Sequence, residues 1–327
     1  MHTKRILTLC MVLLIPSIIQ AQDNKLNLVL ENQEHISVKS LISKFSSYVG
    51  DTPLTFLETE QIIHKTLPGN RLSLLIKLRG YTDFDWVNGR THKQEHDKMP
   101  SVGGFAFFNK RDDAWQLQQI EMTGEYLETL EFHNLMNDGK EVLVARSGMG
   151  NHAHFMKVYQ LDGMKFKEIL NIEGYGIGPE IIKDNGKEII VDFKNSLLGT
   201  CESCQVYHEQ VYRWDGKEFK AEKDELGKAE DEYSKSYEDE GNKLKHCEKS
   251  LQLYQEYLKT NPNSFAAVAN CAYLYNELGQ KDKVKPFNQL LEKLVDMPNT
   301  ECPHCTLETL TWDKRNRQRV LDQIAGN

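Results

Sequence analysis

The feature that most restricts the fold is a β-type repeat before residue 222. Three segments share two apolar residues, a polar turn with Asp and a later aromatic residue: FFNKRDDAWQL (107–117), VYQLDGMKFKEI (158–169) and VYRWDGKEFKA (211–221). Aliphatic runs recur in step with them: LSLLIKL (72–78), EVLVARS (141–147) and EIIVDFK (188–194). Asp-Gly between apolar runs favours a hairpin, because both central residues of a type I′ turn need positive φ. We predict three strand-plus-hairpin units forming a β-rich repeat domain over 22–222.

Two of these units contain motifs of a known repeat family. Asp-Gly-Lys-Glu followed by three apolar residues occurs at 138–144, and Val-Tyr-x-x-Asp-Gly-x-x-Phe occurs at 158–166 and 211–219. Over 130–221 the chain therefore resembles the blades of FG-GAP or VCBS-type β-propellers. Because a closed propeller needs at least about four blades, three units predict an open sheet or a partial propeller. We expect the segment 37–49 to form a covering helix.

The propeller resemblance implies a calcium loop built from alternating Asp or Asn oxygens. The matching stretch is 134–139, where Asn134, Asn137 and Asp138 supply oxygens but Met136 occupies a ligand position. The other copy, 181–186, begins with an isoleucine. We therefore expect no calcium and no other cofactor.

After residue 222 the apolar period changes from that of a strand to that of a helix. Segment 264–279 places five residues on one helical face, with Ser264 as N-cap and Gly279 as the stop: Val268, Cys271, Ala272, Tyr275 and Leu278. The next helix does the same with Phe287, Leu290, Leu291, Leu294 and Val295. The alternating charges of 221–243 predict a solvated helix or linker. We therefore predict an α+β chain with a helical domain over 223–327.

The helical part resembles a tetratricopeptide repeat (TPR) over 244–298. The resemblance rests on Ala272, Tyr275, Gly279 and the junction NPNS, with SLQLYQEYLKTNP (250–262) as the end of an earlier copy. Val284 and Asn288 depart from the pattern. The resemblance implies binding of a protein or peptide partner in a concave groove, and we expect five residues to contact it: Tyr254, Tyr257, Asn270, Tyr273 and Asn276. A generic helical hairpin packed on the β domain is the alternative.

The first residues have the pattern of an export signal. A basic start with Lys4 and Arg5 precedes the apolar run 6–19 and the small-residue end at Ala21. We predict a signal peptide over 1–21 and no transmembrane segment after its cleavage. Because no Asn-x-Ser/Thr acceptor occurs, a bacterial periplasmic or secreted protein is favoured.

The net charge argues against one class of partner. The full chain carries −8, and removal of Lys4 and Arg5 with the leader makes this −10. Nucleic acids require basic patches that neutralise phosphates. We therefore expect no nucleic acid among the partners.

The quartet CPHC (302–305) has the spacing of a redox-active pair. A thioredoxin-like enzyme carries its CxxC at a helix start after a buried strand, whereas a helix tail and a polar turn precede Cys302. We therefore predict a structural disulfide between Cys302 and Cys305. A helix starting at Thr306 would lower the pKa of Cys302, so a thiol-disulfide oxidoreductase is the alternative.

The six cysteines of the mature chain form an even set. In an oxidising compartment this predicts three disulfides, namely 201–204, 302–305 and Cys247 with Cys271. Cys201 and Cys204 also form a CxxC, and the two CxxC pairs together have the composition of a four-thiolate zinc site. Whether the pairs are disulfide-bonded, redox-active or metal-bound stays open at this level.

Two groups of histidines offer a metal alternative. His92, Glu95 and His96 have the letters of an inverted zinc-protease motif, although Pro100 limits any helix there. His152 and His154 alternate as on one strand face. Together they define a metal-dependent hydrolase as a second alternative, but histidines in polar loops are more often surface residues. The main prediction is an exported binding protein without catalysis, for example an inhibitor or immunity-type binder.

Overall fold

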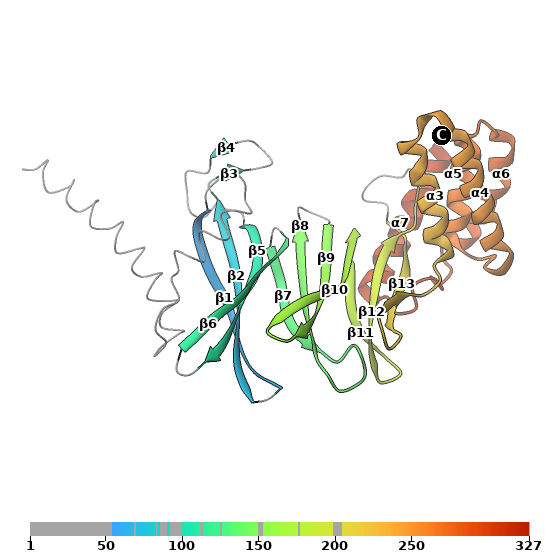
Figure 1. The fold of residues 1–327 in the computed structure, drawn as a ribbon. Helices are drawn as coiled ribbons and strands as arrows, with labels where there is room; N and C mark the ends of the chain where they lie inside the picture. Colours follow the sequence, from blue (N-terminus) through green and yellow to red (C-terminus); the bar gives the residue numbers. More distant parts are fainter. Residues whose placement is uncertain are drawn as a thin grey trace, which may run out of the picture. The chain divides into compact units, whose positions relative to one another are not determined.

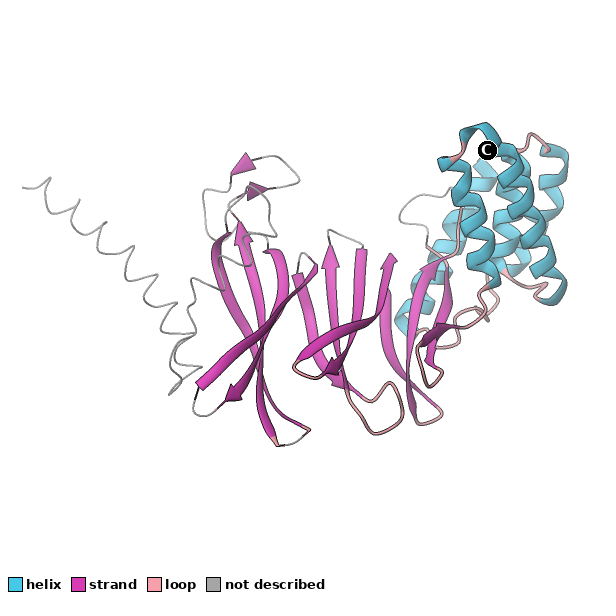
Figure 2. Ribbon diagram, viewed as in Figure 1, coloured by secondary structure: helices cyan, strands magenta, loops and turns pink. Residues whose placement is uncertain are grey.

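The computed structural model describes residues 54–326 except 69, 83, 86–89, 92–99, 112–113, 125, 150–152, 176 and 199–204. The predicted leader and the predicted covering helix at 37–49 lie outside these residues. The described part is α+β, with sheets followed by helices (Figures 1 and 2). None of its helices is both long enough and apolar enough to span a membrane.

Three four-stranded antiparallel sheets make up the β part, each with its strands in chain order (Figure 1). The first contains β1 (Leu54–Leu67), β2 (Arg71–Thr82), β5 (Pro100–Arg111) and β6 (Ala114–Gly124). The second contains β7 (Tyr126–His133), β8 (Val142–Met149), β9 (Ala153–Asp162) and β10 (Lys165–Tyr175). The third contains β11 (Gly178–Asp184), β12 (Lys187–Asn195), β13 (Tyr207–Trp214) and β14 (Phe219–Ala221). A small extra sheet pairs β3 (Phe84–Asp85) with β4 (Arg90–Thr91).

The sequence repeat occupies equivalent places in the three sheets, which confirms the strand-plus-hairpin prediction. The aliphatic runs form the second strands, β2, β8 and β12, and the repeated hairpins form the third and fourth strands. The repeated aromatic residues are Trp115, Phe166 and Phe219. Trp115 and Phe166 are buried, and Phe219 contacts Trp214 of its own hairpin. Phe166, for example, lies edge-on to Phe107 with 4.7 Å between ring centroids. The second strand of each sheet contributes buried aliphatic residues to the core.

The turn type differs between two of the hairpins. Asn185 and Gly186, between β11 and β12, have φ of 51° and 78°, as a type I′ turn requires. Asp162 instead ends β9, and at that turn Gly163 has a positive φ of 62°. The expectation of positive φ at both residues of that Asp-Gly pair was wrong, because the glycine takes the first central position, as in type II′ turns.

The chain forms two compact units, and the third sheet belongs with the helices. The first unit comprises Met1–Phe132, Val142–Asn151 and Phe155–Asn171, and the second comprises His133–Glu141, His152–His154 and Ile172–Asn327. The predicted boundary at 222/223 marks the change from strands to helices and falls inside the second unit. Leu197 and Val206, at the ends of β12 and β13, pack in one core with helix residues such as Phe265.

Five α-helices follow the strands: α3 (Glu225–Glu238), α4 (Lys243–Thr260), α5 (Phe265–Glu277), α6 (Val284–Leu294) and α7 (Leu307–Gly326). The helix predicted over 264–279 is confirmed as α5, together with both of its ends. The Ser264 side chain accepts a hydrogen bond from the Ala267 N–H at the N-terminus, and Gly279 has a φ of 70° after the C-terminus. The charged stretch 221–243 is only partly solvated, because α3 buries Leu226, Ala229 and Tyr233. Consecutive helices from α3 to α6 contact one another.

Candidate functional site

The segment that leads into the CPHC quartet lies along the first residues of β13, the part of this strand that the short β14 does not pair with. The Glu209 N–H donates to the Glu301 carbonyl at 3.0 Å, and the Asn299 side-chain amide donates to the Tyr207 carbonyl at 2.8 Å. A bare edge strand presents unpaired backbone groups that invite pairing with other chains. The loop between α6 and α7 therefore pairs with backbone groups of β13 that β14 leaves unpaired.

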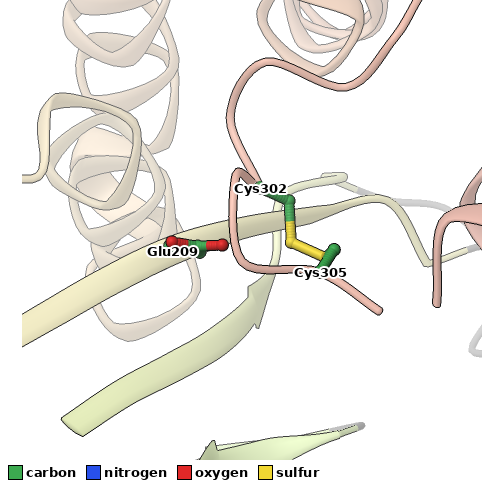
Figure 3. A group of neighbouring side chains, drawn as sticks. All are labelled: Glu209, Cys302 and Cys305. Carbon is green, nitrogen blue, oxygen red and sulfur yellow. A yellow bond between two sulfur atoms is a disulfide. The ribbon is translucent and has the colours of Figure 1, made fainter. Parts of the chain in front are cut away.

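A buried carboxylate holds the quartet in place. Glu209 accepts one hydrogen bond from the backbone N–H of His304 at 2.5 Å, and its other oxygen lies 2.6 Å from His304 Nδ1. The Glu209 side chain is 4% exposed, whereas that of His304 is 29% exposed. Figure 3 shows this carboxylate directed toward the two cysteines.

Cys302 and Cys305 form a disulfide, with 5.3 Å between their Cα atoms, as predicted. Cys302 is 2% exposed and packs with Ile189, Val191 and Phe193. Thiol-disulfide exchange requires a thiolate to reach one of the sulfurs, and the burial of Cys302 blocks the side on which a nucleophilic first cysteine would act. The nearest helix, α7, starts at Leu307, so its N-terminus adjoins Cys305 rather than Cys302.

A buried ion pair on α7 contacts both β13 and the loop after α6. Arg317 Nε lies 2.8 Å from Asp313 Oδ2, with both side chains buried. Asp313 also accepts from the Tyr207 N–H at 3.3 Å, and Arg317 donates to the Met297 carbonyl at 3.1 Å, beyond the end of α6. Burial raises the pKa of Asp313, while Arg317 and the hydrogen bonds act in the opposite direction.

A second polar cluster joins β12, β13 and α3. Ser196 Oγ lies 2.6 Å from His208 Nδ1, and His208 Nε2 lies 3.2 Å from Asp224 Oδ2. These are the residue types of a Ser-His-Asp triad. However, Ser196 is 0% exposed and His208 2%, so no substrate reaches the hydroxyl. Asp224 also caps α3 by accepting from the Gly227 N–H at 2.7 Å. The cluster is therefore structural.

The surroundings of this cluster perturb several titrations. Burial alone would lower the pKa of His208, but the hydrogen bond to Asp224 and the charges of Glu230 and Asp224 raise it overall. Burial raises the pKa of Asp192 to about 6, against the opposing charges of Lys194 and His208. Burial likewise raises the pKa of Glu230 to about 7.

Two of the five predicted partner-binding residues, Tyr254 and Asn270, are buried. Tyr254 belongs to the helical core. Asn270 donates to the Ser196 carbonyl at 2.6 Å and accepts from the Leu198 N–H at 2.9 Å. Asn270 therefore joins α5 to the segment that follows β12. Tyr257 is half-buried and donates to Glu301 at 3.1 Å. Asn276 is exposed and Tyr273 is half-buried.

Tyr273 belongs to a group that we call the tyrosine surface, made of Tyr233, Tyr237 and Tyr273 on α3 and α5. The Tyr233 hydroxyl lies 2.8 Å from that of Tyr237 and 2.9 Å from that of Tyr273. Both ring pairs are edge-to-face, with centroids 5.3 Å and 5.9 Å apart. Tyr233 is buried, whereas Tyr237 is 65% exposed.

The remaining predicted site residues do not form a common site among the described residues. Cys247 and Cys271 are free thiols in the structure, so the predicted third disulfide is absent; each is buried among apolar helix residues, and burial raises the pKa of both. Six others lie outside the described residues: His92, Glu95, His96, His152, Cys201 and Cys204. His154 is partly buried on β9.

Sequence reasoning missed Glu209 and the Ser196–His208–Asp224 cluster. Asp224 carried a signal, because an aspartate before a helical pattern is a typical N-cap. Glu209 carried none, since 95 positions separate it from His304.

Comparison with known proteins finds no family model, no curated protein and no solved structure that matches this chain. The TPR and propeller resemblances therefore stay predictions.

Proposed function

We propose that this chain is an exported protein that binds a protein partner at the tyrosine surface. The observation that carries the proposal is the exposure of Tyr237, which leaves 65% of a large aromatic residue uncovered on α3. Exposed aromatic residues held in place are typical anchors of protein interfaces. An inhibitor or immunity-type protein would be one form of such a binder.

The hydrogen bonds of the tyrosine surface support this role. Because the Tyr237 hydroxyl is 2.8 Å from that of the buried Tyr233, its ring has a preferred position before any partner binds. A side chain that is already ordered loses little conformational entropy on binding. Tyrosine also offers an apolar ring together with a polar tip. The exposed ring of Tyr237 is thus suited to contact a protein partner.

The charge around the tyrosine surface defines the partner. Residues 225–243 contain seven acidic and three basic side chains. Three of the acidic ones, Glu238, Asp239 and Glu240, are exposed and directly follow Tyr237. Lysine or arginine side chains are attracted both to carboxylates and to the face of a tyrosine ring. The partner is therefore a protein segment rich in lysine or arginine.

Selection from a random peptide display library on the chain 22–327 tests this function. We expect the enriched peptides to carry lysine or arginine, to bind more weakly as salt is raised, and to lose binding to Tyr237→Ala. Trp312→Ala is the matched control, because Trp312 is also an exposed aromatic residue, 48% exposed, but lies on α7. Enrichment of peptides without basic residues, or equal binding to Tyr237→Ala, would contradict the proposal.

A further inference from the structure

We propose that reduction of the Cys302–Cys305 disulfide creates a binding site for a thiophilic divalent cation such as Zn²⁺, with both thiolates and Glu209 as ligands. The two sulfurs and a Glu209 oxygen all lie within 4.8 Å of one another (Figure 3). Among the described residues, this is the group of His, Cys, Asp or Glu side chains whose ligand atoms are close enough together to bind one metal ion. The site is independent of the tyrosine surface.

The donor set matches the chemistry of zinc. Zinc binds cysteine sulfur at about 2.3 Å and carboxylate oxygen at about 2.0–2.2 Å in a tetrahedron, which places neighbouring ligand atoms about 3.5 Å apart. Opening the disulfide lets the sulfurs separate toward this distance. Three protein ligands leave the fourth position to a solvent molecule, and Cys305, one of the three ligands, is only partly buried.

His304 has a role outside the ligand set. Its ring Nδ1 lies 2.6 Å from one Glu209 oxygen, so the imidazole restricts the orientation of the carboxylate. Hydrogen-bonded partners of this kind commonly fix the direction of metal ligands. In the oxidised protein the same hydrogen bond holds the loop against β13. This contact gives the Glu209 carboxylate, which is only 4% exposed, a polar partner.

The loop is held by contacts that do not depend on the disulfide. The Glu209 N–H bonds to the Glu301 carbonyl at 3.0 Å, and the Cys305 N–H bonds to the Cys302 carbonyl at 3.1 Å. The His304 N–H bonds to Glu209 at 2.5 Å. These bonds keep the two cysteines and the carboxylate together after the S–S bond breaks, so the ligands are preorganised.

The redox step is a thiol-disulfide exchange with a dithiol reductant. One thiolate of the dithiol attacks the sulfur of Cys305, which is only partly buried, so the S–S bond breaks and Cys302 leaves. The second thiol of the reductant then displaces Cys305 from the mixed disulfide, the two cysteines take up the two protons of the dithiol, and the reductant becomes a cyclic disulfide. Cation binding then releases the two thiol protons to solvent, because both sulfurs coordinate as thiolates. The oxidised chain has no thiolate at this place, so the disulfide prevents binding.

The test uses the chain 22–327 with Cys201→Ser and Cys204→Ser, so that the other CxxC contributes no thiolate. The protein is reduced with dithiothreitol, freed of it without air, and titrated with Co²⁺ as a spectroscopic probe and then with Zn²⁺. We expect one Co²⁺ per chain with thiolate-to-cobalt absorption, displaced by Zn²⁺. The oxidised protein and the Cys302→Ser variant should lack this absorption.

Glu209→Gln tests the carboxylate and keeps both cysteines. We expect its affinity for Co²⁺ to fall on the order of 10-fold or more, while Glu218→Gln, an exposed glutamate of the β13–β14 loop, leaves it unchanged. Circular dichroism confirms that each reduced variant is folded. Absence of thiolate absorption in the folded reduced protein, or full affinity in Glu209→Gln, would overturn the proposal.

Discussion

Replacing Asp192 by asparagine should stabilise the protein above neutral pH. Asp192 lies on β12 with 0% exposure, and neither carboxylate oxygen has a hydrogen-bond partner among the described residues. Burial raises its pKa from 3.8 to about 6. The folded protein therefore binds this proton more tightly than the unfolded chain does. Ionisation of Asp192 above pH 6 costs stability, and the cost disappears below pH 3.8.

The size of the effect follows from the pKa difference. A shift from 3.8 to about 6 corresponds to about 3 kcal/mol of unfolding free energy once the group is ionised in both states. This shift already includes the attraction of Asp192 to Lys194 and His208, which lower its pKa. We therefore expect Asp192→Asn to gain up to about 3 kcal/mol at pH 8 and less at pH 5.

Urea unfolding at pH 8 and pH 5 measures this difference. The helical circular dichroism signal reports on the second unit, because all the described α-helices lie there. Asp231→Asn is the matched control, since Asp231 is an exposed aspartate of α3 and surface substitutions usually stay within about 0.5 kcal/mol. A loss of stability in Asp192→Asn at pH 8, or an equal gain at both pH values, would refute the assignment of a costly buried charge.

Three further substitutions test separate parts of the second unit. Glu230→Gln should flatten the rise in stability that the wild-type protein shows as pH falls from 8 toward 5, because its folded pKa of about 7 lies above its ordinary 4.5; urea titrations at several pH values measure the slope. Asp313→Asn should cost about 3 kcal/mol or more by leaving Arg317 buried without its carboxylate, whereas Asp296→Asn, in an exposed pair with Lys314, should cost under about 1 kcal/mol. Ser264→Ala should cost about 1 kcal/mol, since it removes the cap of α5, and a normal thermal midpoint in that variant would contradict the capping role.

The sequence alone determined the local elements of this protein. The three repeated hairpins and the position of their aliphatic strands were predicted, because alternation and turn residues act over a few neighbouring positions. The limits of α5 were predicted for the same reason, since Ser264 and Gly279 act within one turn of the helix ends. The Cys302–Cys305 bridge is equally local, because its two cysteines are three positions apart in the sequence.

Tertiary structure decided which polar residues are buried and which groups meet. Tyr254 and Asn270 were predicted as surface residues of a helical module, but Tyr254 is buried in the core of the helices and Asn270 is bonded to the segment that follows β12. Glu209 meets His304 across 95 positions, and Ser196 meets His208 across two strands. No sequence pattern encodes these pairs. The burial of a side chain, and with it the cost of its charge, depends on every group packed around it, and those groups come from distant parts of the chain.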